Sequence, residues 1–324
     1  MSARGGIDLG GTKIQAAVVD EGGSVIGESR RPTPREGGPP DVAAAMAAAM
    51  REAAKEAGVE TQALAGVGVG SPGAVDDAAG TVSSARNLPG WDGSFALAKE
   101  LGGALGTPVS LGNDVQVATD AEFHLGAGRP YGSLIGVFWG TGVGGGLILD
   151  GRPWLGRHAA GEIGHMVVKM DGAHCPCGRR GCMEAYAGRA AMEAKARHEH
   201  EKGEKTDLFK LMKHHDKDRL TSGIWARALD HGDKLAIHLI DRAVEALGAG
   251  IASAVNLLDP EAVVIGGGMG TRLGQPMADR IAGAMAPHVF FDEPPDVRVA
   301  SLGDLGGAIG ASLRVAGRDS SDGR

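Results

Sequence analysis

Apolar and polar positions alternate through the first thirty residues and are separated by short turn-forming stretches. Apolar runs at 7–9, 13–19 and 24–29 are joined by Gly10-Gly-Thr12 and by an Asp-Glu-Gly-Gly stretch at 20–23. Alternation with a period of two, bounded by glycine turns, is typical of strands. The pattern therefore predicts three strands connected as a meander.

The pattern then changes to a helical one. A proline- and glycine-rich stretch at 32–40 precedes an alanine-rich run that we expect to be capped by Asp41 and to stop at Gly58. The runs at 66–69 and 109–112 predict two buried strands, and 115–125 predicts the helix fed by the second of them.

The second half of the chain repeats this order. Residues 130–149 carry no charge over a length that would span a bilayer, but glycines interrupt them, so we expect a strand at 133–139, a loop at 140–146 and a strand at 147–149. A long amphipathic helix at 235–256, a strand at 262–265 and a last helix at 306–315 follow. Two similar openings in one chain indicate a duplicated α/β architecture with a cleft between the halves.

A charged, histidine-containing stretch at 195–218 interrupts the second half. His198, His200, His214 and His215 are the residue type of a second metal site, but dense mixed charge is more typical of a solvated helical insertion. We therefore interpret the stretch as an insertion on the surface.

Composition and charge exclude several classes of protein. The chain has 33 basic and 40 acidic residues, a net charge of −7, whereas nucleic-acid binding needs a basic excess. The N-terminus shows no signal-peptide pattern, which predicts a cytoplasmic protein outside the membrane. Glycine is in excess, with 55 of 324 residues, and this predicts tight turns and loops that approach a ligand closely.

The stretch from Asp8 to Lys13, Asp-Leu-Gly-Gly-Thr-Lys, combines a strand end with a glycine turn. The N–H groups at Gly10 and Gly11 can approach a phosphate, Thr12 and Lys13 add a hydroxyl and a positive charge, and the Asp8 carboxylate suits a hydrated Mg²⁺. A plain hairpin turn is the alternative.

Residues 140–146, Gly-Thr-Gly-Val-Gly-Gly-Gly, contain the G-x-G-x-x-G pattern of dinucleotide-binding sites. That fingerprint requires the glycines to open a helix. Here they lead into Leu-Ile-Leu and then Asp150-Gly151, a two-residue hairpin turn. A second phosphate loop is therefore the better interpretation.

Three cysteines and a histidine have the spacing of a metal site. His165, Cys175, Cys177 and Cys182 give the pattern H-x9-C-x-C-x4-C. Three thiolates and an imidazole complete a tetrahedral zinc shell without an open position, so the site would be structural. Three unrelated reduced cysteines are the alternative.

Asn113-Asp114 follows a predicted strand and begins a predicted helix. Asp114 could accept a proton from a substrate hydroxyl, although these two residues alone favour a helix cap. Asn87, Glu162 and Glu184 add hydrogen-bonding groups without a basic cluster, which favours a neutral polyol over an anionic ligand.

In this order, the motifs resemble those of the ROK family of sugar kinases and repressors. The resemblance extends from Asp-Leu-Gly-Gly-Thr through Gly-Glu-Ile-Gly-His (161–165) and the cysteine motif to the final Gly-Gly-Ala-Ile-Gly-Ala (306–311). It implies an actin-like ATPase (ribonuclease H-like) α/β fold around an ATP and sugar cleft. Residues 1–115 and the helix at 304–317 would form one domain. Residues 116–303 would form the other, which carries the zinc loop, and residues 318–324 would be a disordered tail.

The resemblance also implies roles for particular residues. Asp114 matches the catalytic base. The matching hexose-binding positions are Gly73, Asn87, Asn113, Asp114, Glu162, His165 and Glu184. The matching ATP-binding positions are Asp8, Gly10, Gly11, Thr12, Lys13, Gly140, Thr141, Gly142, Gly144, Gly145, Gly266, Gly267 and Gly268. The implied cofactors are ATP, Mg²⁺ and a structural Zn²⁺ on His165, Cys175, Cys177 and Cys182.

The implied reaction is ATP-dependent phosphorylation of a hexose at its 6-hydroxyl, with glucose as the first choice. Kinases for N-acetylmannosamine, N-acetylglucosamine or fructose are the alternatives, and the donor could be polyphosphate. A sugar-responsive repressor would carry an N-terminal helix-turn-helix, whereas here the phosphate-loop strand begins near residue 7. The resemblance further implies a homodimer or homotetramer. The acidic net charge and the lack of a signal-peptide or membrane-spanning pattern predict neither nucleic acid nor a membrane as partner.

Overall fold

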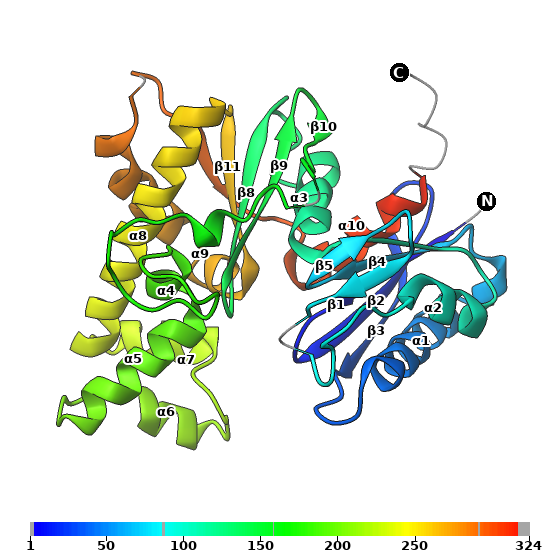
Figure 1. Ribbon diagram of the computed structural model, residues 1–324, viewed down its shortest axis with the longest axis horizontal. Coiled ribbons are helices and arrows are strands. Elements are labelled where there is room, and N and C mark those ends of the chain that lie inside the picture. Colours follow the sequence, from blue (N-terminus) through cyan, green and yellow to red (C-terminus); the bar gives the residue numbers. More distant parts are fainter. Residues whose placement is uncertain (1–2, 86–87, 158, 291, 317–324) are drawn as a thin grey trace.

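Two five-stranded sheets form the frame of the molecule (Figure 1). The computed structural model describes residues 3–85, 88–157, 159–290 and 292–316. Asn87 and the predicted tail at 318–324 lie outside the described residues. No helix within these ranges is both long and apolar enough to cross a membrane.

The elements of the first half, in chain order, are β1 (Arg4–Leu9), β2 (Lys13–Val19), β3 (Val25–Pro32), α1 (Pro39–Glu56), η1 (Thr61–Ala63), β4 (Val67–Ser71), β5 (Ala74–Asp76), β6 (Thr81–Ser83), α2 (Leu97–Leu105) and β7 (Val109–Asn113). Those that follow are α3 (Asp114–Leu125), β8 (Leu134–Trp139), β9 (Val143–Leu149), β10 (Arg152–Pro153), η2 (Ile163–His165), α4 (Glu184–Ala187), α5 (Arg189–Glu201), α6 (Leu208–His214), α7 (Ser222–Asp230), α8 (Lys234–Leu258), β11 (Ala262–Gly266), α9 (Gly267–Met285), η3 (Ala286–His288), β12 (Asp296–Val299), η4 (Gly303–Leu305) and α10 (Gly306–Ala316).

Both sheets have the same strand order. The first runs β3-β2-β1-β4-β7, and the second runs β10-β9-β8-β11-β12. In each, the first three strands pair antiparallel and the last three pair parallel. The prediction of a duplicated α/β architecture is therefore confirmed. The carboxyl ends of the parallel strands meet at one edge of each sheet, which is where ligands bind in open α/β sheets.

The last helix of the chain, α10, packs on the first sheet rather than on the second (Figure 1). A Cβ atom at Gly6 would lie 1.9 Å from the carbonyl oxygen of Ala308, and one at Gly68 would lie 1.7 Å from that of Ala311. The two glycines therefore let the helix lie directly on β1 and β4. Because α3 packs against both α10 and β9, the domain boundary at residue 115 stays a prediction.

The glycine-rich stretch at 140–146 differs from its prediction as a loop. The turn covers only 140–142, and residues 143–146 belong to β9, paired antiparallel with β8. The reason is the helix that covers this strand: a Cβ at Gly146 would lie 2.2 Å from Thr119 Oγ1, and one at Gly144 would lie 2.6 Å from Val115 Cγ2. These glycines admit α3, and the hairpin confirms that no dinucleotide-binding helix follows them.

The start of α1 also differs slightly from its prediction. The helix begins at Pro39, with Gly38 as its N-cap, and Asp41 lies in the first turn. The Asp41 carboxylate accepts a hydrogen bond of 3.0 Å from the Gly38 N–H. The side chain therefore stabilises the helix start from inside, and favourably placed negative charge adds to the effect.

Candidate active site

The predicted base, Asp114, lies where β7 becomes α3, at the carboxyl edge of the first sheet. Asn113 is the N-cap of α3, and its Oδ1 accepts hydrogen bonds of 3.1 Å from the N–H groups of Val115 and Gln116. The capping interpretation of Asn113 is thus confirmed. The cap fixes the backbone of the next residue, and so holds Asp114 at the first turn of the helix.

A second carboxylate, Asp8, lies close to Asp114 in space. Asp8 sits near the end of β1, and β4 separates β1 from β7 in the sheet. Burial raises the pKa of Asp114 from 3.8 to about 7, and the negative charges of Asp8 and Glu162 add to the shift. Burial also raises the pKa of Asp8 to about 6, against the opposing charge of Lys13. A raised pKa in a carboxylate pair is typical of catalytic sites.

A cavity of 480 Å³ lies between the two halves; Asn113, next to Asp114 in the chain, lines it, whereas Asp114 and Asp8 themselves do not. Its lining includes Gly73, Asp77, Leu111, Asn113 and Arg314 from the first half and α10, and Leu155, Ala160, Glu162, His165 and Arg179 from the second half. The structure thus brings together four of the predicted hexose positions: Gly73, Asn113, Glu162 and His165. Asp114 follows Asn113 directly.

The cavity wall also contains an ion pair that the sequence analysis missed. Arg314 on α10 donates a hydrogen bond of 2.7 Å to Asp77, whose other oxygen accepts one of 2.7 Å from the Leu111 N–H. The two charged residues are 237 positions apart in the chain, and no local motif marks either of them. Only the packing of the last helix on the first sheet brings them together.

The first predicted phosphate segment is a tight turn between β1 and β2. The Gly10 N–H donates to the Lys13 carbonyl at 2.9 Å, and Thr33 Oγ1 donates to the Gly10 carbonyl at 2.6 Å. Gly11 and Thr12 are exposed at its tip. The Lys13 ammonium lies 3.5 Å from the Asp304 carboxylate. The turn is thus presented to solvent, with its one cation paired to an exposed acid.

The second predicted segment keeps only Gly140, Thr141 and Gly142 in a turn, because Gly144 and Gly145 lie in β9. Glu184 holds this turn: its Oε2 accepts a hydrogen bond of 2.9 Å from the Val143 N–H. The carboxylate therefore lies against the glycine turn. The remaining glycines, Gly266, Gly267 and Gly268, lie where β11 ends and α9 begins.

The predicted metal ligands do come together. One ligand atom each from His165, Cys175, Cys177 and Cys182 lies within 4.8 Å of the other three, and this is the only such group among the described residues. The Cys175 Sγ to His165 Nδ1 and the Cys177 Sγ to Cys182 Sγ distances are both 3.7 Å. Ligands of a tetrahedral zinc ion at about 2.0–2.3 Å stand about 3.3–3.8 Å apart. The donor set and these two distances therefore fit zinc.

His165 connects this group to the cavity. Its Nδ1 faces Cys175, and its Nε2 lies 3.8 Å from Oε2 of Glu162. One ring edge belongs to the metal group and the other faces a cavity carboxylate. The same imidazole can therefore bind a metal and take part in the cavity wall.

Comparisons with known proteins agree with this geometry. A model of the ROK family matches residues 4–317. The glucokinase of Thermotoga maritima is 32% identical over 319 residues, which cover 96% of this chain and 98% of that protein. An N-acetyl-D-glucosamine kinase of Pectobacterium atrosepticum is 31% identical over 326 residues, covering 95% and 97%. The structure of a ROK family glucokinase from Streptomyces griseus, in complex with glucose and AMPPNP, superposes with a TM-score of 0.84 at 31% identity, covering 96% and 98%. The chain therefore belongs to the ROK family and has its actin-like ATPase fold.

Proposed function

We propose that this protein is an ATP-dependent hexose kinase that converts glucose to glucose 6-phosphate. The observation that carries the proposal is the position of Asp114: a half-buried carboxylate with a pKa near 7, beside a cavity lined by hydroxyl-binding groups from both halves. A general base is most effective when its pKa lies near the working pH. Family membership and the similarity to glucokinases support the choice of reaction.

Asp114 would accept the proton of the 6-hydroxyl as its oxygen attacks the γ-phosphorus. The bond between the γ-phosphorus and the β,γ-bridging oxygen breaks, and ADP leaves with the electron pair. Asn113, Glu162, His165 and Gly73 would hold the ring with the 6-hydroxyl toward Asp114, and Asn87 and Glu184 are proposed to assist. Holding the reactants in line contributes as much as the proton transfer in such reactions.

The phosphates would lie between the glycine turns of the two halves. The turns at Gly10–Thr12 and at Gly140–Gly142 are proposed to bind them through backbone N–H groups other than those of Gly10 and Gly140, which donate within their own turns. Lys13 would add a positive charge, and Gly266–Gly268 would border the adenosine. The Asp8 carboxylate would hold Mg²⁺, which neutralises charge on the β- and γ-phosphates when bound. Asp8 fits this role because burial raises the pKa of its carboxyl and its negative charge raises that of Asp114, so a bound cation would offset both.

The cysteine and histidine group is proposed to hold a structural zinc ion. A closed shell of three thiolates and one imidazole leaves no position for substrate. Zinc would fix the loop at 175–182 and the His165 ring, so that Nε2 keeps its place beside Glu162. Its contribution would be positioning of the sugar site.

A coupled assay tests the function directly. Glucose, mannose, fructose and the N-acetylhexosamines are each supplied with ATP and with polyphosphate. We expect the highest kcat/KM for glucose with ATP. Turnover with no pair would contradict the kinase proposal.

A kinase for N-acetylhexosamines is the second candidate, because an N-acetyl-D-glucosamine kinase is almost as similar to this chain as the glucokinases are. A kcat/KM for N-acetylglucosamine above that for glucose would favour it. Fructose and polyphosphate remain further arms of the same assay. From family membership we also propose a cytoplasmic homodimer or homotetramer.

A further inference from the structure

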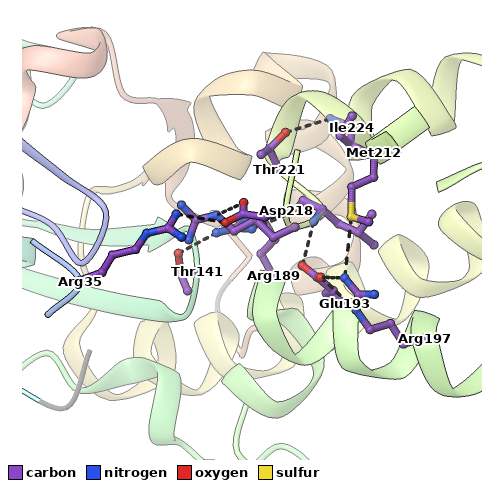
Figure 2. A network of polar contacts seen from close by, with 11 residues as sticks. Arg35, Thr141, Arg189, Glu193, Arg197, Met212, Asp218, Thr221 and Ile224 are labelled. Carbon is purple, nitrogen blue, oxygen red and sulfur yellow. Dashed lines mark hydrogen bonds and ion pairs between the residues drawn. The ribbon is translucent and has the colours of Figure 1, made fainter. Parts of the chain in front are cut away.

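An arginine with an unusual environment lies directly beside the glycine turn of the second half. Arg189 is the first residue of α5, and its guanidinium donates hydrogen bonds of 2.9 Å to Thr141 Oγ1 and to the Leu220 carbonyl (Figure 2). The backbone N–H groups of Arg189 and Ala190 donate to the carbonyls of Gly140 and Thr141. The start of α5 and the glycine turn therefore form one rigid unit, with a cation attached to it.

The charged insertion returns to this same place. After α6, residues 218–222 run back past Arg189, and Leu220 supplies one of its acceptors. A Cβ at Gly268 would lie 3.8 Å from Ser222 Oγ. The returning segment thus lies near both glycine stretches at the carboxyl edge of the second sheet, the 140–142 turn and the start of α9.

The charges of this cluster do not balance. Asp218 lies 3.1 Å from Arg35, which comes from the first half (Figure 2). The Asp218 carboxylate also lies 4.0 Å from Arg219. The nearby Glu193 already accepts from Arg197 at 2.6 Å and from the Leu220 N–H at 2.8 Å. Arg35 and Arg219 thus share the Asp218 carboxylate. The two acceptors of the Arg189 guanidinium, a carbonyl and a hydroxyl oxygen, carry no charge, in a chain whose net charge is −7.

Arg189 is the arginine of this cluster whose positive charge is disfavoured by its surroundings. Burial lowers the pKa of Arg189, and the positive charge of Arg219 lowers it further, against the partial compensation of Glu193. A purely structural network gains nothing from two neighbouring like charges that are partly removed from water. An anion that binds between them would remove the repulsion and gain two charge-assisted contacts.

We propose that Arg189 and Arg219 bind the phosphate chain of the donor nucleotide. The insertion would then form a third wall of the nucleotide site through residues 218–222, in addition to the two glycine turns. Arg35, from the opposite half, pairs with the Asp218 carboxylate. The cluster of Arg35, Arg189, Asp218 and Arg219 therefore includes residues of both halves. This inference rests on the proposed function in one respect, that the donor is a nucleoside triphosphate.

Under this proposal, removing an arginine and removing the Asp218 charge should have different effects on the KM for MgATP. Arg189→Ala and Arg219→Ala each remove a cation, and we expect each to raise the KM for MgATP about ten- to a hundredfold, the usual range for a lost charged hydrogen bond. The KM for glucose should stay within about twofold. Asp218→Asn removes the competing carboxylate, so the KM for MgATP should stay unchanged or fall. Loss of a purely structural network would instead impair all three variants alike.

Matched variants control for folding. Arg197→Gln, also on α5 but bonded to Glu193 instead of the glycine turn, should leave both KM values unchanged. Arg189→Lys keeps the charge without the planar fork, and should fold even if Arg189→Ala does not. It should raise the KM for MgATP less than Arg189→Ala does. The wild-type KM for MgATP should also rise more steeply with salt than that of Arg189→Ala.

Calorimetric titration of each folded variant with MgATP and with inorganic tripolyphosphate separates this proposal from the proposed function. The arginine assignment is overturned if Arg189→Ala keeps the wild-type affinity and KM for MgATP. If Arg189→Ala does not fold, it is overturned when Arg189→Lys and Arg219→Ala both keep them. Either result leaves the kinase proposal intact. Wild-type protein that binds MgATP but phosphorylates no sugar overturns the kinase proposal, and the affinities of the variants still decide the role of the arginines. Wild-type protein that binds neither ligand overturns both.

Discussion

The two halves of the molecule share one strand order and present different chemistry at the same edge. The carboxyl edge of the first sheet carries Asp8 and Asp114, two carboxylates with raised pKa values. The corresponding edge of the second sheet carries the glycines at 140–142 and 266–268, with Arg189 attached. The shared strand order places both proposed ligand-binding regions at the carboxyl edges of the sheets. The edge of the first sheet is proposed to carry out proton transfer, and that of the second to bind phosphate.

The second half also differs in carrying the group of one histidine and three cysteines that we propose to hold zinc, and removing that metal should have the largest effect. Cys182→Ser removes a fully buried ligand, and we expect about one zinc per chain in the wild type to fall to near zero. Structural zinc sites supply on the order of 10 kcal/mol in small peptides, so the loop should become sensitive to protease and the KM for glucose should rise. Elemental analysis, limited proteolysis and kinetics measure these changes.

His174→Ala is the matched control for the metal. His174 lies in the same loop but outside the ligand group, and its Nε2 contacts Arg180. Its zinc content should equal that of the wild type. An active wild-type protein without metal would refute the structural role of zinc.

The first half should control the chemical step. Asp114→Asn removes the proposed base and keeps the size of the side chain, and we expect kcat to fall about 10²–10⁴-fold with little change in the KM for either substrate. Steady-state kinetics with glucose and MgATP measure the effect. A raised KM with an unchanged kcat would mean that Asp114 binds substrate rather than accepting its proton.

Two glutamates test where the sugar site ends. Glu162 lines the cavity and Glu184 lies against the glycine turn. Glu162→Gln should raise the KM for glucose about tenfold, since one charged hydrogen bond contributes about 1.5–3 kcal/mol. Glu184→Gln should also raise it. If only the KM for MgATP changes in Glu184→Gln, the residue belongs to the phosphate half and its proposed sugar contact is wrong.

The smallest effect concerns stability and pH. Burial raises the pKa of Asp114 from 3.8 to about 7 in the folded protein. The buried carboxyl is therefore neutral below about pH 4, and folding loses stability as the pH rises from there through 7, because the folded protein must then bury a charged carboxylate. Asp114→Asn should therefore raise the melting temperature at pH 8 by a few degrees and leave it unchanged at pH 4. Calorimetric melts across this range measure the difference. An equal gain at both pH values would show that charge is not its cause.

The regular elements could be predicted because their signals are local. Glycine turns mark both ends of β2, Asn113 caps α3, and the apolar face of α8 runs through its whole length. The loop predicted at 140–146 was wrong over 143–146, because Gly144 and Gly146 there make room for Val115 and Thr119 on α3. Nothing local distinguishes a glycine in a turn from one in a strand beneath a helix.

The site divides in the same way. The metal ligands could be predicted, because four of the strongest ligand types lie within 18 residues of sequence, and the structure brings them together. The Asp77–Arg314 pair and the cluster of Arg35, Arg189 and Arg219 could not, because each depends on segments joined only by folding. A lone arginine carries no motif, so its role appears only with its neighbours.

The account depends most on Asp114 facing the reacting hydroxyl between the two halves. A structure of the wild-type protein with glucose and AMPPNP tests this directly. We expect an Asp114 carboxylate oxygen within about 3 Å of the glucose 6-hydroxyl, with the terminal phosphate on the opposite side of that oxygen. A bound glucose whose 6-hydroxyl points away from Asp114 would contradict the account.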